Sequence, residues 1–480
     1  MSIQPVALFD LDFFEPLPIH IETSDAPLTA DAGLLPLRQF DERLGLTGQF
    51  AQALDDPRAA ALIDHSFADM VRMRIFGILA GYEDQNDHDT LRTDPVFKLI
   101  AGRSPLAADL ASQPTLSRFE NQIDIPSLKR LRALFVQQFI TSFAQPPRTL
   151  TFDLDAVDDP THGAQQLSLF HGFYEQYQYL PLVLTSADTD QVVMLSLRHG
   201  TATAYLGADD DLEYLVTCLR AAWPDVRILV RGDAGFGKPV LFDVCERLGI
   251  EYTFGLSANP VLQRRSEELL AAAVRVWDET HTPQRHFTGF DYQAGSWPVP
   301  RRVVVKAEAT AQGTNRRFVV TNRPGASVCP EATYDEYALR GESENRNKEL
   351  KCGVGMDRLS DHRFVANLFR MYLHAAALNL LVRLRREIAD PPPAPTEAPV
   401  ETLAGDARKR YQNARRRRDP LGEGHPATWR LLLIKVAASV VVSCRRIVVR
   451  LSGSWPHQHY FEHVRQHVCR RPAVAHIWTG

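Results

Sequence analysis

The sequence predicts an α/β protein in which a mixed β-sheet core is combined with helical segments at both ends. Two observations lead to this prediction. In residues 1–145, apolar side chains recur at three- and four-residue intervals, which is the period of amphipathic helices. From Arg148 onward, short apolar segments alternate with polar residues and are followed by strand and helix patterns in turn. This second pattern is typical of an α/β core with a mixed sheet.

The bulk composition is that of a soluble, multidomain protein. A chain of 480 residues exceeds the roughly 250–300 residues at which single cores stop growing. The N-terminus lacks the basic segment of a signal peptide, so we expect a cytoplasmic protein. Charged residues interrupt the apolar stretch Leu431–Leu451, where we therefore predict a buried helix rather than a membrane span. The six cysteines form no CxxC pair, which favours reduced thiols over zinc ribbons or disulfides.

The first domain is predicted to comprise residues 1–145 and to be helical. Helices are expected at Leu35–Leu44, Ala59–Leu79 and Leu128–Phe143, where the apolar period is clearest.

The core is predicted to comprise residues 146–258 and 322–390. It begins with a strand in which Asp153 and Asp155 lie on one face, because side chains alternate along a strand. The other expected elements of this part are strands at Leu180–Leu184, Gln191–Leu197, Arg227–Val230 and Tyr252–Leu256, and a helix near Pro239–Leu248. A long helical region is expected from Tyr334 to Ile388.

Two further parts complete the predicted organisation. Residues 259–321 are rich in Val, Phe, Tyr and Trp and are expected to form a β-rich insertion between the two parts of the core. Residues 391–480 are predicted to be a proline-rich linker followed by a helical, basic C-terminal region. Residues 401–480 hold 15 Lys and Arg against 5 Asp and Glu, although the whole chain has a net charge of −4. This asymmetry predicts contact of the C-terminal region with a polyanion.

The most informative pattern lies in YALRGESENRNKELK, where Tyr337, Arg340, Glu344 and Lys351 are spaced Y-(2)-R-(3)-E-(6)-K. On a helix, this spacing brings all four side chains to one face. That face suits a helix that binds a metal through Glu344 and phosphates through Arg340 and Lys351. The alternative is a solvated helix with ion pairs between its own residues.

Two acidic positions upstream follow apolar strands. In ILVRGDAGFGKP, a strand leads into Asp233, and the glycines around it allow a sharp turn that exposes the carboxylate. The alternative for Asp233 is a cap of the helix near Pro239. In TFDLDAVDDPTHG, periodicity does not choose between Asp153 and Asp155, and Asp158 and Asp159 are better explained by a turn.

Three carboxylates that lie far apart in the sequence can together bind the metal ions used in phosphoryl transfer. Two Mg²⁺ ions held by such groups activate the attacking oxygen and stabilise the leaving oxygen, and Mg²⁺ prefers hard oxygen ligands.

These motifs in this order resemble those of bacterial insertion-sequence transposases of the DDE class, over roughly residues 148–386. The resemblance implies a ribonuclease-H-like core, and it implies that Asp155, Asp233 and Glu344 are the catalytic, metal-binding triad. Asp155 is preferred because the small residue Ala156 follows it, as is common in the family, but Val157 departs from the family pattern. Asp153 therefore remains the alternative ligand.

The resemblance also implies the cofactor, the partners and the reaction. Mg²⁺, for which Mn²⁺ can substitute, would support cleavage at the terminal inverted repeats of an insertion sequence and joining of the 3′-hydroxyl ends to target DNA. Double-stranded DNA would be the partner, a homodimer would form on it, and the N-terminal domain would take part in binding. Tyr337, Arg340 and Lys351 would contact DNA. No membrane is implied.

Two other features are weighed as DNA contacts. Trp297 in the insertion would stack on an extruded base, although a packed aromatic is the better explanation. The basic run at Arg415, Arg416, Arg417 and Arg418 is suited to nonspecific phosphate contact, and a solvated segment is its alternative. His457, His459, His463 and His467 near Cys469 fit no usual zinc spacing.

Alternative functions from the same residues are a metal-dependent nuclease that does not join strands and a catalytically inactive DNA-binding derivative. A carbohydrate hydrolase with paired carboxylates would not explain Arg340, Lys351 or the basic C-terminal region.

Overall fold

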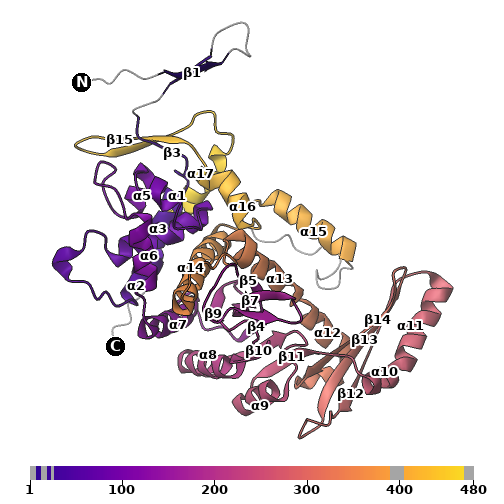
Figure 1. The fold of residues 1–480 in the computed structure, drawn as a ribbon. Helices are drawn as coiled ribbons and strands as arrows, with labels where there is room; N and C mark the ends of the chain where they lie inside the picture. Colours follow the sequence, from indigo (N-terminus) through magenta and orange to yellow (C-terminus); the bar gives the residue numbers. More distant parts are fainter. Residues whose placement is uncertain (1–6, 12–18, 23–25, 390–404, 470–480) are drawn as a thin grey trace.

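An eight-stranded mixed sheet runs through the middle of the protein (Figure 1). The structure, a computed structural model, describes residues 7–11, 19–22, 26–389 and 405–469. The strand order is β12-β13-β14-β11-β10-β4-β8-β9. The bounds are β4 Thr149–Ala156, β8 Leu182–Ser186, β9 Val192–Ser196, β10 Arg227–Gly232, β11 Glu251–Leu256, β12 Gln284–Tyr292, β13 Arg301–Thr310 and β14 Gly313–Thr321. The predicted α/β class with a mixed sheet is confirmed.

The three central strands are parallel, and the remaining neighbours are antiparallel. A parallel strand can follow another only through a crossover connection. Helix α8 (Ala208–Ala222) lies between β9 and β10 in the chain, and α9 (Pro239–Leu248) connects β10 to β11. Apolar side chains of both helices share one buried core with the central strands, among them Phe152, Leu215 and Phe242.

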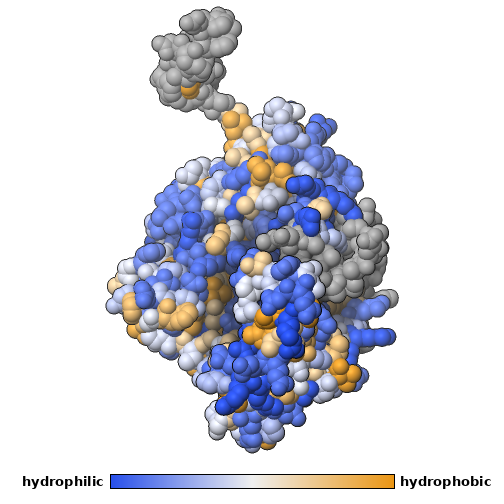
Figure 2. All heavy atoms as spheres, turned by 90° about the vertical axis from the view of Figure 1, so that its right-hand side faces the viewer, coloured by the Kyte–Doolittle hydropathy of each residue, from blue (hydrophilic) through white to orange (hydrophobic). Residues whose placement is uncertain are grey.

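Residues 259–321 differ in part from the expected β-rich insertion. They begin with two helices, α10 (Pro260–Arg265) and α11 (Glu267–Thr280), before the strands β12, β13 and β14. The strands do not form a sheet of their own, because β14 pairs antiparallel with β11 and so continues the central sheet. On the side of the protein where these elements lie, the surface is mostly hydrophilic, with hydrophobic residues in small patches (Figure 2).

The N-terminal part is largely helical, as its apolar period predicts. Its elements are β1 Ala7–Leu11, β2 Ile19–Glu22, β3 Leu28–Thr29, α1 Leu34–Leu44, α2 Leu46–Gln52, a 3₁₀ turn at Ala60–Leu62, α3 Phe67–Ala80, α4 His88–Leu91, α5 Pro95–Ile100, α6 Gln113–Asn121 and α7 Ile125–Ile140. The three short strands were not predicted. Ser66 caps α3 by accepting from the Asp69 N–H, and the Asp69 carboxylate in turn accepts from the Ser66 N–H. This capping box explains why the helix starts at Phe67 rather than at Ala59.

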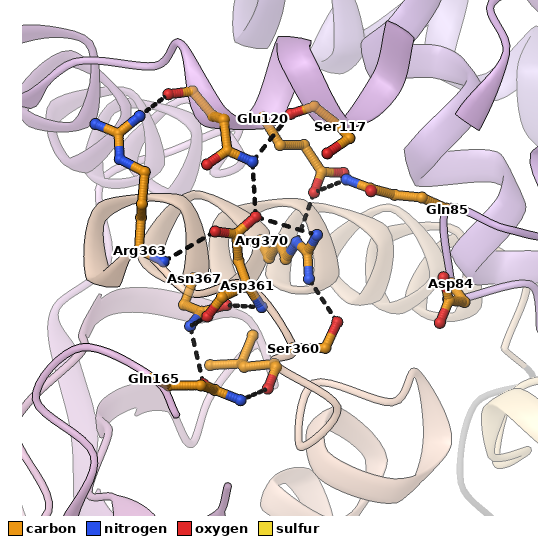
Figure 3. A network of polar contacts seen from close by, with 12 residues as sticks. Asp84, Gln85, Ser117, Glu120, Gln165, Ser360, Asp361, Arg363, Asn367 and Arg370 are labelled. Carbon is orange, nitrogen blue, oxygen red and sulfur yellow. Dashed lines mark hydrogen bonds and ion pairs between the residues drawn. The ribbon is translucent and has the colours of Figure 1, made fainter. Parts of the chain in front are cut away.

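A buried polar network joins the N-terminal helices to the later helix α14 (Phe364–Ile388) (Figure 3). Glu120 on α6 accepts from Arg74 Nε at 2.7 Å and from Arg370 Nε at 2.6 Å. Nearby, Asn121 donates to the Asp361 carboxylate at 2.8 Å. Each buried charge thus has an opposite charge beside it, which is the condition for burying it at acceptable cost.

The segment from Tyr334 to Ile388 is not one continuous helical region. It consists of α12 (Pro330–Ala338), α13 (Gly341–Lys348), a π-helical turn at Glu349–Gly353 and, after the non-helical residues 354–363, α14. A 3₁₀ turn at Pro324–Ser327 precedes α12. By length and composition α14 is apolar enough to cross a membrane, but 89% of its most apolar window is buried inside the protein. It is the central helix of the core that it shares with the N-terminal helices.

The C-terminal region corrects two expectations. After α15 (Gly405–Arg418), α16 (Pro426–Trp429) and a π-helical turn at Arg430–Ile434, the chain forms a hairpin of β15 (Ala438–Val442) and β16 (Ile447–Leu451), then α17 (Gln458–Val468). The predicted buried helix at Leu431–Leu451 is wrong, since the β-branched runs VVV and IVV favour strands. The region is therefore not wholly helical, and β15 pairs with β3 near the N-terminus. The proline run at 391–395 lies outside the described residues.

Candidate functional site

Asp155 and Asp233 lie at the carboxyl ends of two adjacent parallel strands. In the register of β4 and β10, Leu154 is opposite Gly232, so the next residue of each strand is an aspartate. The pKa of Asp155 is raised to about 6, mainly by burial; Asp233 and Glu344 also raise this pKa, and Arg340 lowers it. Three carboxylates and one guanidinium thus share one electrostatic environment.

The turn after β10 depends on close backbone approach. A Cβ on Gly235 would lie 2.7 Å from the Ala204 Cβ, and a Cβ on Gly237 would lie 2.4 Å from the Gly255 carbonyl oxygen. The Gly235 N–H donates to Asp233 Oδ1 at 2.8 Å, which fixes the side chain at the start of the turn. Helix α9 begins after Lys238 and has no side-chain cap. Asp233 is therefore not the cap of that helix.

Arg340 lies between the carboxylates of the strand and the helix. Its guanidinium is 3.7 Å from Asp155 Oδ2 and 3.7 Å from Glu344 Oε1. The Glu344 side chain is 59% exposed and Asp155 only 17% exposed, so the cluster opens to solvent on the side of α13. Burial raises the pKa of Tyr337, Arg340 lowers it and Asp233 raises it, which indicates that the phenol lies beside the same group of charges.

Asp153 has a different environment from Asp155, although both lie on one face of β4. The Asp153 carboxylate accepts from Arg231 Nε at 2.7 Å and from Arg231 Nη2 at 2.8 Å. Both partners are almost fully buried. A bidentate pair of this kind uses both carboxylate oxygens, so both oxygens of Asp153 already have a partner in Arg231.

The remaining predicted residues are not all brought to this cluster. Lys351 lies in the π-helical turn and its ammonium binds Asp158 at 3.1 Å. The four motif residues therefore do not share one helix face, because the chain turns between α12 and α13 and changes period after Lys348. Trp297 is 6% exposed and packs edge-on against Phe242 at 5.3 Å. The structure supports a packed aromatic there and not a free stacking surface.

The basic run forms the C-terminal end of α15. Arg416 and Arg417 are exposed, and Arg415 forms an ion pair with Glu423.

Near the C-terminus, the His467 ring is 2.9 Å from the His463 carbonyl oxygen. Within the described part of the chain, no group of three His, Cys, Asp or Glu side chains is arranged to hold a metal ion.

Sequence reasoning missed Asn347, which donates to Asp155 Oδ2 at 2.6 Å. Its position three residues after Glu344 on a helix was the available signal, since residues at that spacing share a face. Arg231 was also missed, and no local pattern could have paired it with Asp153.

The donor chemistry of the cluster suits a divalent cation. Asp155, Asp233 and Glu344 offer carboxylate oxygens, and the pKa of Asp155 is raised mainly by burial and to a smaller extent by the negative charges of Asp233 and Glu344, which a cation would offset. In the structure Arg340 supplies the positive charge between Asp155 and Glu344. Binding of one ion by all three acids therefore requires the exposed Glu344 side chain to rearrange.

Comparison with known proteins identifies a family model that matches this chain. The family model described as "Transposase DDE domain group 1" matches residues 15–404, which is most of the chain. The matched range covers the N-terminal helices, the sheet, the carboxylate cluster and α14, and it ends immediately before α15. No curated protein matches the sequence.

Proposed function

Since this chain belongs to the family of DDE transposase domains, we propose that it is a transposase that cuts the ends of an insertion sequence and joins them to target DNA. Divalent metal ions are general in this family, and DNA is the partner that the family implies. The observation that carries the proposal is the cluster itself. Arg340 lies 3.7 Å from both Asp155 and Glu344, and Asp233 adds to the charge around Asp155.

Asp155, Asp233 and Glu344 would hold two Mg²⁺ ions, for which Mn²⁺ can substitute. Such ions, when bound, activate a water or a 3′-hydroxyl and stabilise the leaving oxygen. The preference for Asp155 over Asp153 is supported by the bidentate pair that occupies Asp153. Asn347 orients the Asp155 carboxylate by donating to Oδ2, and the Gly235 N–H does the same for Asp233.

The proposed reaction has two steps, cleavage at the transposon end and joining to target DNA. In the first, water attacks a phosphorus atom at the transposon end, the bond to the 3′ oxygen breaks, and a 3′-hydroxyl and a 5′-phosphate result. In the second, this 3′-hydroxyl attacks a target phosphorus, and the target's own 3′ oxygen leaves with the proton. One phosphodiester bond forms for each that breaks, so the joining step needs no external energy source.

Arg340 and Tyr337 are proposed to contact the phosphate next to the cut, because both lie beside the carboxylates. Lys351, in the π-helical turn after α13, is paired with Asp158 and would bind a neighbouring phosphate after exchange of that partner. The exposed arginines of α15 would make sequence-independent phosphate contacts.

Because two ends must be joined, a dimer on DNA is proposed, and the protein would act at the DNA in the cytoplasm. Trp297 has no part in this proposal.

Two alternatives remain distinct from a transposase: a nuclease that cuts without joining, and a DNA-binding derivative without activity. The test is incubation with a labelled duplex that carries the end of the flanking element, together with a supercoiled target plasmid, in Mg²⁺ or Mn²⁺. We expect metal-dependent cleavage and insertion products. Cleavage without insertion would favour the nuclease, and binding without either product would favour the derivative.

The matched variants are Glu344→Gln and Glu342→Gln, which remove one charge from the same helix. Glu342 accepts from Asn345 at 3.1 Å and is not part of the carboxylate cluster. We expect Glu344→Gln to lower cleavage by more than about 100-fold, because the loss of a metal ligand removes several kcal/mol of transition-state stabilisation. Glu342→Gln should retain activity. Equal losses in both variants would contradict the assignment of Glu344.

A further inference from the structure

A small three-stranded sheet follows the strand that carries Asp155 and has no part in the proposed cleavage and joining reactions. It consists of β5 (Asp159–Pro160), β6 (Leu169–His171) and β7 (Gln176–Tyr179), in the order β5-β7-β6. Only two residues separate β4, which carries Asp155, from β5. In Figure 1, β5 and β7 lie close to β4. The small sheet thus follows directly from the strand that carries Asp155.

The base of this hairpin is firmly attached to the protein. The Gly200 N–H donates to the Leu167 carbonyl at 3.2 Å, and a Cβ on Gly200 would lie 2.2 Å from the Gln178 carbonyl oxygen. Tyr179 is fully buried and its hydroxyl donates to the Gln166 carbonyl at 2.8 Å. The turn therefore projects from a rigid support.

The outer half of the hairpin has the opposite character. It exposes four aromatic side chains, which we call the aromatic tip: Phe170, Phe173, Tyr174 and Tyr177. Phe173 is 83% exposed at the turn, although burying a large aromatic ring is normally favourable. The rings support one another edge to face, with centroids 5.6 Å apart for Phe170 and Tyr177 and 5.1 Å apart for Phe173 and Tyr174. Exposed apolar side chains gathered on one hairpin commonly mark a binding surface.

The aromatic tip lies on the hairpin that follows β4, the strand that carries Asp155. Burial raises the pKa of Tyr174, and Asp158, Asp233 and Asp155 raise it further, so its phenol lies within electrostatic range of the candidate metal ligands. A DNA strand with one phosphate at these carboxylates would have its neighbouring nucleotides at the aromatic tip. From Gln165 to Tyr179 the only residue with a formal charge, His aside, is Glu175. The hairpin therefore offers ring faces and no cation for phosphates.

We propose that the aromatic tip stacks on unpaired bases of the DNA strand that enters the carboxylate cluster, with Phe173 as the outermost stacking ring. This inference rests on the proposed function, because it takes the occupant of the neighbouring site to be DNA. Every base has an aromatic face, so stacking is independent of sequence, and exposed rings are what proteins use to hold single-stranded segments. The hairpin holds the bases while the arginines elsewhere bind the phosphates.

The test uses the full-length protein without divalent cation, so that no strand is cut. The probes are a blunt duplex and the same duplex with a five-nucleotide unpaired tail that carries 2-aminopurine, whose fluorescence falls on stacking. We expect the wild type to bind the tailed duplex more tightly and to quench the probe. Phe173→Ala should weaken binding of the tailed duplex by about tenfold, restore the fluorescence, and leave binding of the blunt duplex unchanged.

Two controls separate stacking from other effects of the change. Phe173→Trp should bind and quench as the wild type does, because it keeps an aromatic face. Leu62→Ala removes another exposed apolar side chain, 81% exposed and in the N-terminal part, and should change neither measurement. Because the hairpin lacks a phosphate-binding cation, the salt dependence of binding should have the same slope in Phe173→Ala as in the wild type.

The outcomes distinguish failure of this inference from failure of the proposed function. If the protein cleaves DNA in a Glu344-dependent manner but Phe173→Ala binds and quenches as the wild type does, the stacking inference is wrong and the transposase proposal stands. If Phe173→Ala changes only the oligomeric state, the aromatic tip is a contact between copies of the chain, which also overturns the inference. If the wild type binds neither duplex, both proposals fail.

Discussion

Arg231 and Asp153 form a bidentate ion pair across neighbouring parallel strands, with Nε–Oδ1 at 2.7 Å and Nη2–Oδ2 at 2.8 Å. Arg231 Nη1 also donates to the Glu336 carbonyl at 2.7 Å, which ties α12 to the sheet. The pair is almost fully buried, and Asp153 lies two residues before Asp155 on β4. One face of β4 therefore carries a structural aspartate and a candidate catalytic aspartate side by side.

Asparagine substitution should separate these two roles. Asp153→Asn leaves the buried Arg231 charge without its carboxylate partner, and breaking a buried pair costs about 3–5 kcal/mol, so the free energy of unfolding should fall by that order. Asp155→Asn removes a carboxylate whose burial raises its pKa, so the free energy of unfolding should not fall. Urea unfolding at neutral pH measures both.

Activity should show the reverse order when expressed per folded molecule. Asp155→Asn should abolish metal-dependent cleavage, and Asp153→Asn should keep cleavage at temperatures where it is folded. If Asp153→Asn is stable and inactive while Asp155→Asn cleaves DNA, the roles assigned to the two residues are exchanged.

The second prediction concerns Glu349, five residues after Glu344. Its carboxylate accepts from Arg385 at 2.9 Å and Arg346 at 2.8 Å, and His425 Nδ1 lies 2.7 Å away. Burial alone raises the pKa of Glu349, but the contacts with His425, Arg385 and Arg346 outweigh it and hold the pKa well below its ordinary value. Glu349→Gln should therefore lower the free energy of unfolding by about 3–5 kcal/mol at pH 7.

The sign of the pH dependence follows from the lowered pKa of Glu349. Its contribution is fully present above the unfolded-state pKa of about 4.3 and is lost as the pH falls towards the folded-state value. The difference between wild type and Glu349→Gln should thus be larger at pH 7 than near pH 3.5 in urea unfolding. Glu462→Gln, which breaks the surface pair with Arg465, should leave the midpoint nearly unchanged. A difference that grows on acidification would contradict this account.

The third prediction tests whether Arg340 supplies the positive charge that a metal ion would bring. Arg340→Ala leaves Asp155, Asp233 and Glu344 without their shared cation. Added Mg²⁺ should then raise the melting temperature of Arg340→Ala by roughly 2–4 °C more than that of the wild type, because binding to the folded state adds stability. Scanning fluorimetry with and without Mg²⁺ measures the shift.

The control is a double variant in which Asp155→Asn is added to Arg340→Ala. Arg340→Ala combined with Asp155→Asn should lose the enlarged Mg²⁺ shift, since one of the repelling charges is gone. A shift that persists in the double variant would mean that Mg²⁺ binds elsewhere.

The fourth prediction concerns the basic end of α15. Replacing the exposed Arg416 and Arg417 by alanine should weaken binding of all duplex sequences to a similar extent. The slope of log K against log salt should fall by roughly 2, because each phosphate contact contributes about 0.9. Binding measured at several salt concentrations, with two unrelated duplexes, gives the slope.

A matched pair of arginines serves as the comparison. Arg445 and Arg446 are exposed in the turn between β15 and β16, and their replacement removes the same charge. We expect the slope to stay at the wild-type value in that variant. Equal changes in both double variants would indicate a general effect of net charge rather than contact through α15.

The helices of the N-terminal part and the strands of the core could be predicted from sequence because their signals are local. The two-residue period around Phe152 and the three- to four-residue period in Leu34–Leu44 are properties of near neighbours in the chain. Local signals, namely strands that lead into aspartates and a helical spacing around Glu344, also predicted where the candidate acids lie, but they did not choose between Asp153 and Asp155. The triad of Asp155, Asp233 and Glu344 was implied by the family resemblance.

The assignment of Asp153 and the environment of Trp297 depended on partners far away in the chain. Asp153 is 78 residues from Arg231, and periodicity gives it the same face as Asp155. Likewise, the run Leu431–Leu451 is apolar enough for a buried helix, but its valines pair as strands and meet β3 near the N-terminus. The local period of apolar residues determines which side chains share a face. The tertiary structure alone decides which distant side chain neutralises a buried charge or covers a ring, because such contacts join segments that have no common local pattern.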